Sequence, residues 1–529
     1  MRQGKSDRIK PIPLTLAIVL LCSAPSMGAQ RTTAEEHMLR ATNLVQMKDL
    51  AGAEEELREA VKLAPGEPRY WAHLGIVLGM RQRLEESADC FELALKLDPT
   101  NLEVRRNLAV QEWQLGRLLA ADKDIGVVLE SDPTDSHAIL LRGMVAESST
   151  DYAKAAELLA SVWPLVKERP ETTAALGHAY YRLGERVKAR EALLSLLKQT
   201  GNAEGVFLGG QLAFDGGDYA TAETLFLAIQ QNYPDPVRLG YSLALTQFRD
   251  NRFEASRKTL LDLIQAGRET CEIYSLLAAC FQKEENYEAS AVAFERAINL
   301  DPKKEVNYVD LGLVLIRFRR YAAAEAVAER AVKAFPGSSK VREVQGMAEI
   351  LMQDYASAEK SYASAAGLNS QSAEANLGLA EAQWGAGNVQ QAFTTFEEGI
   401  KHFPQDALHY QEYGRALLKH AETGDSVAEN QAVTMLTKAI ALDSTLSEPH
   451  YLLGNLALRK DQTEEARQHL EEASRLNSKG AKIHFALSRA YRRLGRKDEA
   501  AREFELFRKL RAQEENAPAA SLLAGAVGD

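Results

Sequence analysis

The side chains best suited to chemistry are few and scattered in this chain of 529 residues, which has ten histidines and four cysteines. No glycine-rich phosphate loop, His-Glu-x-x-His, Cys-x-x-Cys or nucleophile elbow occurs in it. His450 and His484 stand 34 residues apart and would lie on the first helices of two adjacent helix pairs, where packing against a neighbouring helix explains them better than a metal ion does. The sequence therefore predicts no catalytic residue, no cofactor and no metal site.

The cysteines are interpreted as small apolar packing residues. Cys271 and Cys280 are nine residues apart on one expected helix, which separates them by about 13 Å along the axis. A disulfide needs about 4.4–6.8 Å between Cα atoms. Cys90, Cys271 and Cys280 are the cysteines that remain after the cleavage predicted below, and we interpret all three as packing residues.

A helix-turn-helix unit of 34 residues is the feature that positions all other side chains. Between residues 67 and 100, Trp71, Leu74 and Gly75 share one face of a first helix, and Phe91 marks the apolar face of a second. The second helix ends at Asp98-Pro99, because proline cannot continue it. Prolines at this spacing are Pro65, Pro99, Pro133, Pro302 and Pro336. Neither helix can bury its apolar face alone, so each unit must pack on its neighbours.

This pattern resembles the tetratricopeptide repeat family, whose unit carries Trp, Leu-Gly and Tyr, then Ala, Phe, Ala and Pro. The resemblance covers about fourteen units over residues 33–511 and is weakest between Ser136 and Gly201. It implies an all-α, right-handed α-solenoid. One inter-helix turn, near residues 421–431, is predicted to be about six residues longer than the rest, and residues 512–529 are predicted to form a disordered tail.

The resemblance also implies that first helices line a concave groove where partner peptides bind. Offsets from the packing face place an aromatic stripe there, which suits an apolar peptide or helix. The predicted partner-binding residues are Trp113, His178, Tyr181, Phe207, Phe214, Tyr241, Phe248 and Trp384. An alternative stays open: if the turns before Tyr219 and Phe253 are one residue short, four of these rings rotate into the helix packing.

The last unit offers a second surface. From Ala481 to Arg511 there are ten basic and four acidic residues on a chain with a net charge of −11. Arg489, Arg492 and Arg493 are predicted to face inward and meet carboxylates. Some family members hold a peptide carboxylate with Lys, Asn and Arg, but this sequence lacks that set, and a terminal repeat must also be polar to stay soluble.

The first 29 residues resemble a secretory signal peptide, with four basic residues, an apolar run from Pro13 to Ala24 and small residues up to Ala29. The run is shorter than the roughly twenty residues of a membrane-spanning helix, so cleavage after Ala29 is predicted and a retained anchor is the alternative. Cleavage removes four basic residues and one acidic residue, so the formal charge falls by three to about −14. An acidic, exported protein binds nucleic acid poorly.

These observations predict a non-catalytic scaffold of the cell envelope, periplasmic or extracellular, that binds other proteins or peptides in its groove. The alternative is a regulatory or substrate-presenting subunit for an envelope enzyme or export system, such as one that handles polysaccharides. An enzyme is disfavoured because the repeats occupy nearly the whole mature chain. The sequence identifies neither the partner nor the oligomeric state.

Overall fold

The computed structural model describes residues 32–422 and 424–516. Every regular element in these two ranges is a helix, and the chain is an all-α solenoid. The elements are α1 (Thr32–Gln46), α2 (Leu50–Leu63), α3 (Pro68–Met80), α4 (Leu84–Leu97), α5 (Leu102–Gln114), α6 (Leu118–Ser131), α7 (Ser136–Ser148), α8 (Tyr152–Ser161), α9 (Trp163–Val166), α10 (Pro170–Arg182), α11 (Arg186–Leu194), the 3-10 helix η1 (Ser195–Gln199), α12 (Ala203–Asp215), α13 (Tyr219–Ala228), α14 (Pro236–Arg249), α15 (Phe253–Gln265), α16 (Cys271–Lys283), α17 (Tyr287–Leu300), α18 (Glu305–Arg317), α19 (Tyr321–Ala334), α20 (Ser339–Leu351), α21 (Tyr355–Leu368), α22 (Ala373–Gly385), α23 (Val389–His402), α24 (Ala407–Ala421), α25 (Ser426–Leu442), α26 (Ser447–Arg459), α27 (Thr463–Leu476), α28 (Ala481–Arg493) and α29 (Lys497–Asn516).

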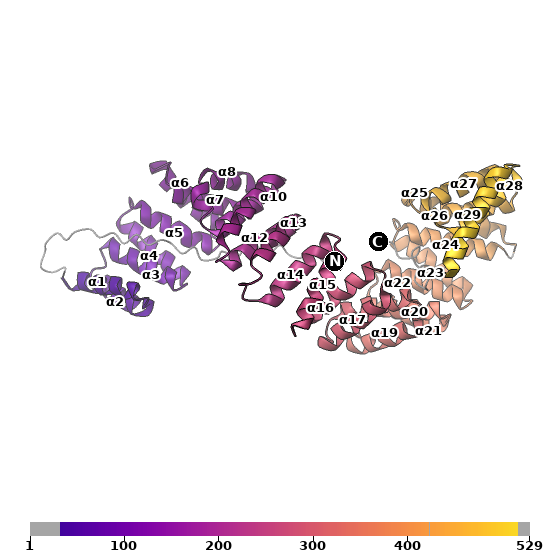
Figure 1. Ribbon diagram of the computed structural model, residues 1–529, viewed down its shortest axis with the longest axis horizontal. Coiled ribbons are helices and arrows are strands. Elements are labelled where there is room, and N and C mark those ends of the chain that lie inside the picture. Colours follow the sequence, from indigo (N-terminus) through magenta and orange to yellow (C-terminus); the bar gives the residue numbers. More distant parts are fainter. Residues whose placement is uncertain (1–31, 423, 517–529) are drawn as a thin grey trace. The chain divides into compact units, whose positions relative to one another are not determined.

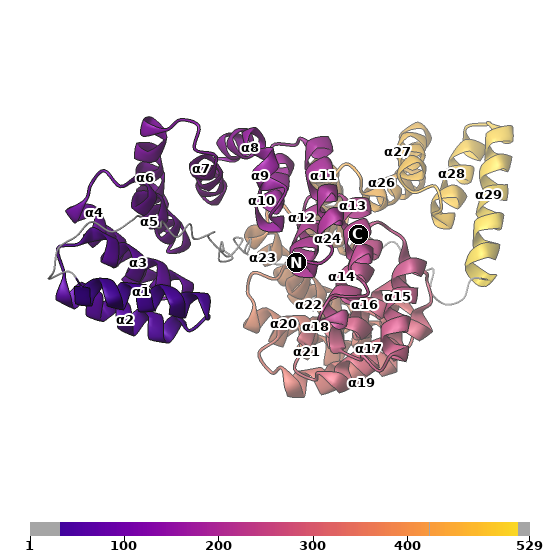
Figure 2. The same cartoon turned by 60° about the vertical axis from the view of Figure 1, so that its left-hand side comes forward.

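These helices form fourteen antiparallel pairs within the described residues, and the four-residue α9 and the 3-10 helix η1 are extra turns. Consecutive helices such as α3 and α4, or α26 and α27, lie side by side (Figures 1 and 2). In seven of the fourteen pairs a glycine of the first helix meets a large side chain of the second. A Cβ atom placed on Gly75 would lie 2.8 Å from the Phe91 ring, and one on Gly454 would lie 2.6 Å from Leu470. The repeated glycine therefore allows the close approach that the sequence predicts.

The turns between the two helices of each pair share one backbone geometry, although their residue types differ. Each such turn contains one residue with a positive φ angle. These residues are Lys48, Gln82, Gly116, Thr150, Gly184, Gly217, Asn251, Glu285, Arg319, Gln353, Gly387, Gly424, Asp461 and Gly495. A left-handed residue after a helix lets the chain reverse direction. Only six of the fourteen are glycine, so the sequence does not mark the other turns clearly.

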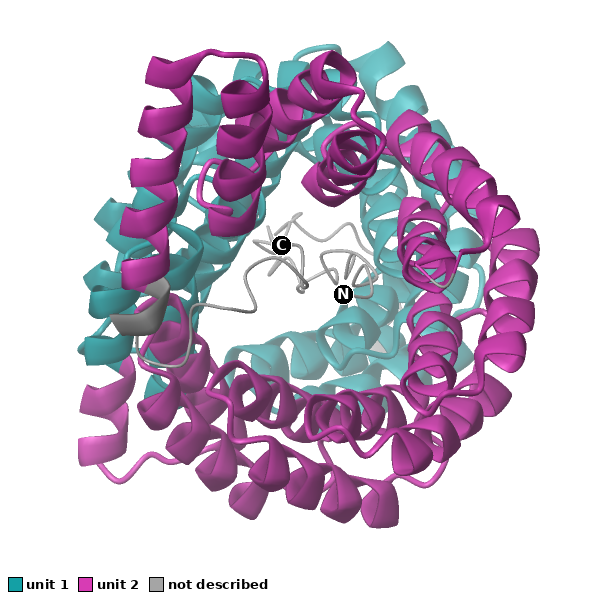
Figure 3. Cartoon of the chain, turned by 90° about the vertical axis from the view of Figure 1, so that its right-hand side faces the viewer, with its two compact units in different colours: residues 1–259 teal, residues 260–529 magenta. Residues whose placement is uncertain are grey.

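The chain divides into two compact units, residues 1–259 and 260–529, coloured separately in Figure 3, with the boundary inside α15. Within unit 1, first helices contact one another in the order α3, α5, α7, α10, α12 and α14, and within unit 2 in the order α18, α20, α22, α24, α26 and α28. Successive second helices touch one another far less in the described residues. The row that packs more closely lies on the inside of a curve, so first helices form the concave side of each unit.

Two predicted boundaries differ from the structure. The extra residues near 421–431 mostly lengthen helices: α24 ends at Ala421 and α25 begins at Ser426 and has 17 residues. The long turn predicted there is wrong, because the added residues continue the helical pattern and can extend it. At the other end α29 runs to Asn516, so the predicted tail begins too early, and residues 517–529 lie outside the described residues, as does the predicted signal peptide.

Candidate interaction surface

Half-buried aromatic side chains follow one another on three consecutive first helices of unit 1. They are Tyr181 on α10, Phe214 on α12, and Tyr241 and Phe248 on α14. The Tyr181 hydroxyl donates to Asp218 Oδ2 at 3.3 Å, and burial raises its pKa. Phe214 packs beside Tyr219 with ring centroids 5.7 Å apart. Each of these two side chains therefore contacts a neighbouring side chain and keeps part of its surface accessible to solvent.

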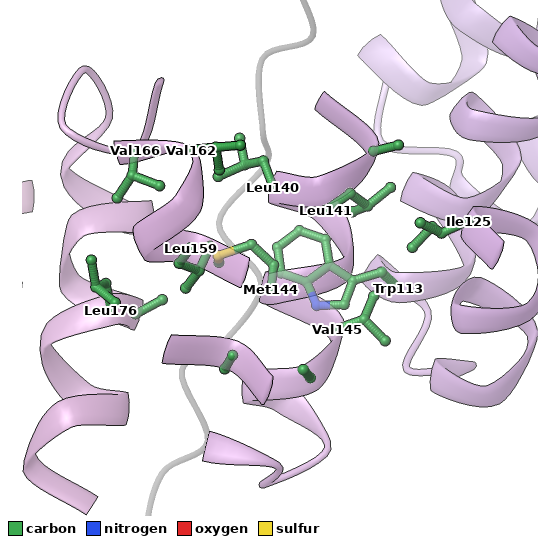
Figure 4. Packing of buried hydrophobic residues seen from close by; sticks show 14 of the residues in the cluster. Trp113, Ile125, Leu140, Leu141, Met144, Val145, Leu159, Val162, Val166 and Leu176 are labelled. Carbon is green, nitrogen blue, oxygen red and sulfur yellow. The ribbon is translucent and has the colours of Figure 1, made fainter. Parts of the chain in front are cut away.

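Two other predicted aromatic anchors do not present open surface, and for them the prediction is wrong. The Trp113 ring is 5% exposed and lies among Leu141, Met144 and Val145 of α7, as Figure 4 shows. Its Nε1–H donates to Ser148 Oγ at 2.9 Å. The next first helix therefore covers this side chain.

Phe207 is 1% exposed. Its ring stacks on Tyr233 at 4.7 Å between centroids, and the Arg238 guanidinium lies 4.3 Å from its centre. Tyr233 reaches it because α13 ends early, at Ala228, and leaves a loop that covers the ring. The cause is not the one considered from the sequence, since the turns before Tyr219 and Phe253 have three residues, like the turn between α3 and α4.

Ionisable side chains lie on the same helices as the aromatic residues of unit 1 or pair with them. His178 Nδ1 lies 2.7 Å from Glu147 Oε1, and the histidine ring meets Tyr152 edge-on at 5.5 Å. The carboxyl of Asp215 is accessible to solvent, yet partial desolvation raises its pKa above the ordinary value against the opposing effect of His178. The sequence pattern indicated His178 but not Asp215, whose position directly after Phe214 was an available signal.

Unit 2 presents a different first-helix surface. Trp384 on α22 is half-buried and stacks on Phe393 at 5.7 Å. Glu381, one turn earlier, lies 3.2 Å from Arg415, but desolvation outweighs that pairing and raises its pKa to about 7. Desolvation also raises the pKa of Asp310 on α18 to about 6. The sequence pattern indicated neither carboxyl, although Glu381 shares a helix face with Trp384.

The basic residues of the last pair separate into two groups. Arg493 donates to the carbonyl of Leu458 and lies 3.3 Å from Asp461, so it joins α28 to the preceding pair. Arg492 is exposed and Arg489 is half-buried, and neither forms an ion pair with a described residue. These two guanidinium groups remain available to an acidic ligand.

Clustered metal ligands and membrane-spanning helices do not occur in the part of the chain that the structure describes. Among residues 32–422 and 424–516, no group of three or more His, Cys, Asp or Glu side chains is arranged around a metal position. In the same ranges no helix is both long and apolar enough to cross a bilayer. Cys90, Cys271 and Cys280 are buried and reduced, which confirms their interpretation as packing residues.

Comparison with known proteins agrees with this architecture. Three sequence profiles described as tetratricopeptide repeat match the chain, one at residues 38–101, 174–235, 309–373 and 451–518, one at 349–414 and one at 272–304. Together the matched stretches cover more than half of the chain. Such repeats support a role as a protein-interaction scaffold.

One curated relative and two solved structures illustrate the similarity. The BBSome complex member BBS4 of Bos taurus is 23% identical over 272 residues, which are 50% of this chain and 46% of that protein, so the chain matches about half of its length. The yeast Tom70 structure is 16% identical, with a TM-score of 0.41, and the match covers 92% of this chain and 94% of Tom70. The APC/C hetero-tetramer Cut9-Hcn1 is 13% identical, with a TM-score of 0.37, over 87% of this chain and 97% of the other.

Proposed function

Because this chain belongs to the tetratricopeptide repeat family, we propose that it is a scaffold of the cell envelope that holds partner segments against its first helices. The proposed contact surface in unit 1 consists of Tyr181, Phe214, Tyr241 and Phe248, and we name it the aromatic row. The proposed partner segment is a helix or extended peptide with apolar side chains.

The observation that carries this proposal is the partial exposure of the aromatic row on three consecutive first helices. Tyrosine and phenylalanine bury a large area with few rotatable bonds, which is why such side chains often dominate binding energies. Two of the helices that carry the aromatic row also carry ionisable groups: Asp215 directly follows Phe214 on α12, and His178, which pairs with Glu147, lies one turn before Tyr181 on α10. A basic residue flanking the apolar segment would complement these carboxylates.

The proposed location rests on the amino-terminal sequence alone. We expect the mature chain to begin at Gln30, after a signal peptide of 29 residues. Amino-terminal sequencing of the protein recovered from an envelope fraction tests this. Recovery of the full-length chain from the cytosol alone would refute export, whereas an uncleaved chain in the membrane fraction would identify residues 1–29 as an anchor.

A second candidate function is regulation of, or substrate presentation to, an enzyme on another chain. Arg489 and Arg492, unpaired within the described residues, favour it because they suit an acidic polymer or peptide. The two functions differ in what co-purifies: a scaffold retains structural proteins, whereas a regulatory subunit retains an enzyme whose activity changes when the chain is removed.

The test of the groove is a capture experiment with the mature chain as bait and envelope extract as source, with prey identified by mass spectrometry. We expect Tyr181→Ala combined with Phe248→Ala to reduce prey recovery at least tenfold, since each interface anchor contributes about 2 kcal/mol. Leu227→Ala is the matched control, because Leu227 is 47% exposed on the second helix α13 of the same unit.

Equal recovery by the double variant and the control would show that the aromatic row does not bind the prey. Loss of prey with Arg489→Glu and Arg492→Glu instead, sensitive to salt, would transfer the contact to the last pair. Unchanged thermal unfolding of each variant is required, so that loss of binding is not loss of fold.

A further inference from the structure

A side-chain pair across the two helices recurs at one position of several repeats. In each case the partners are 19 residues apart, one near the start of the first helix and one in the middle of the second. His37 Nδ1 lies 2.6 Å from Glu56 Oε2 between α1 and α2, and Arg105 Nη1 lies 2.8 Å from Asp124 Oδ1 between α5 and α6. In these pairs a basic group on the first helix meets a carboxylate on the second.

The last two helix pairs place a histidine at the same first-helix position. His484 of α28 follows the rule: its Nδ1 lies 2.6 Å from Glu503 Oε2 of α29. His450 of α26 breaks it, because its Nδ1 lies 3.1 Å from the Nδ1 of His469 on α27. The two imidazole centroids are 5.3 Å apart and the ring planes meet at 46°.

Two imidazole nitrogens that face each other at this distance leave two arrangements. One Nδ1 carries the proton and donates it to the other, or both present lone pairs to a shared cation. A nitrogen–metal bond of about 2.0–2.1 Å and the 3.1 Å separation give a nitrogen–metal–nitrogen angle of roughly 100°. That angle lies between the square-planar and tetrahedral values, so little movement is needed for either geometry.

The His450–His469 pair differs from the His484–Glu503 pair in the protonation that its surroundings favour. The hydrogen bond with Glu503 raises the pKa of His484, which favours the imidazolium that cannot bind a metal. Desolvation lowers the pKa of His450 and of His469, and for His450 the facing His469 and the nearby Arg475 add to the effect, while Glu472 opposes it. Glu465 opposes it for His469. The neutral ring is therefore favoured at both positions, and neutral imidazole is the form that ligates metal ions.

We propose that His450 and His469 form a two-histidine site for a late first-row divalent cation, bound most tightly as Cu²⁺. Water molecules complete the coordination, consistent with the absence of a third His, Cys, Asp or Glu ligand among the described residues. Both rings are half-buried and reach solvent, so the cation can enter without opening the repeat. The proton on one Nδ1 moves to the Nε2 of the same ring, so binding requires no net ionisation. The bound ion joins α26 to α27.

Calorimetric titration of the mature chain, prepared without a polyhistidine tag, tests the site with CuCl₂, ZnCl₂ and MgCl₂. We expect one Cu²⁺ per chain, weaker Zn²⁺ binding and no Mg²⁺ binding, since Mg²⁺ prefers oxygen ligands. His469→Glu recreates the pairing of His484 with Glu503 and should keep the fold while weakening Cu²⁺ binding at least tenfold. His484→Gln is the matched control and should leave the Cu²⁺ affinity unchanged.

Electron paramagnetic resonance supplies an independent readout, because two imidazole nitrogens split the Cu²⁺ signal and one gives a different pattern. A two-nitrogen signal that disappears in both His450→Gln and His469→Glu supports the site. Cu²⁺ affinity and spectrum unchanged in both variants, with circular dichroism like that of the original chain, would place the ion elsewhere and overturn the proposal.

Discussion

Replacement of Gly75 by alanine tests whether the close packing of a helix pair requires a residue without a side chain at this position. Gly75 lies inside α3, and an ideal Cβ there would be 2.8 Å from Phe91 Cε1, 3.0 Å from Cδ1 and 3.1 Å from Cζ. Ordinary carbon contacts are about 3.5–4.0 Å, and Phe91 is 1% exposed and cannot move aside. Such overpacking costs about 1–3 kcal/mol, whereas alanine gains about 0.8–1.0 kcal/mol over glycine in a helix. We therefore expect a net loss of about 0–2 kcal/mol in unfolding free energy.

Gly126→Ala is the matched control. Gly126 also lies inside a helix, α6, but no atom lies within 4 Å of its ideal Cβ. This variant should gain about 0.8–1.0 kcal/mol from helix propensity alone, so the two variants should differ by about 1–3 kcal/mol in urea melts followed by circular dichroism. A difference near zero would refute the packing of Gly75 against Phe91. A double-mutant cycle with Phe91→Leu should show coupling between the two positions.

Three further predictions concern a buried carboxyl group, backbone strain and aromatic burial. Glu112 is 7% exposed, and desolvation raises its pKa to about 7. The folded state therefore holds the proton more tightly than the unfolded chain does. The stability that this group contributes is fully present below about pH 4.3 and is lost as the pH rises through about 7. Glu112→Gln should remove this dependence and add up to about 3 kcal/mol at about pH 8 but little near pH 4 in urea melts, and equal slopes in both proteins would contradict it. Thr150 is a β-branched residue at a φ of 65°. Thr150→Gly should stabilise the folded chain by about 0.5–1 kcal/mol, and the reverse change Gly184→Thr should destabilise it. Thermal melts in which both variants change stability with the same sign would exclude backbone strain as the cause. Phe207→Ala should lower the free energy of unfolding by about 3–5 kcal/mol, as truncation of a core aromatic residue does. Phe214 is half-buried, so Phe214→Ala should lower it less and should reduce partner capture. Similar losses of stability for both variants would mean that Phe214 also belongs to the core.

The architecture could be read from the sequence because a 34-residue repeat makes every packing contact local. Gly75, Phe91 and Pro99 recur with fixed spacing, and a helix pair can bury its apolar faces only against the next pair. The helix pairs, their number and the buried cysteines followed from that periodicity. The family resemblance identified the same fold.

Which of the predicted aromatic side chains stay accessible depended on tertiary contacts. Phe207 became core because the early end of α13 lets Tyr233 cover it, and Trp113 became core because Ser148 and Met144 of the next first helix meet it. The sequence placed both on the concave face but did not show which neighbours cover that face.

The His450–His469 pair illustrates the same division. The sequence alone related His450 to His484, one repeat away, because equal spacing is visible along the chain. Only the fold revealed that each histidine meets the second helix of its own pair, 19 residues on. Glu503 favours the protonated form of His484, whereas desolvation and the facing His469 favour the neutral form of His450. Spacing determines which residues occupy equivalent positions, but the side chain across the helix pair determines their charge and chemistry.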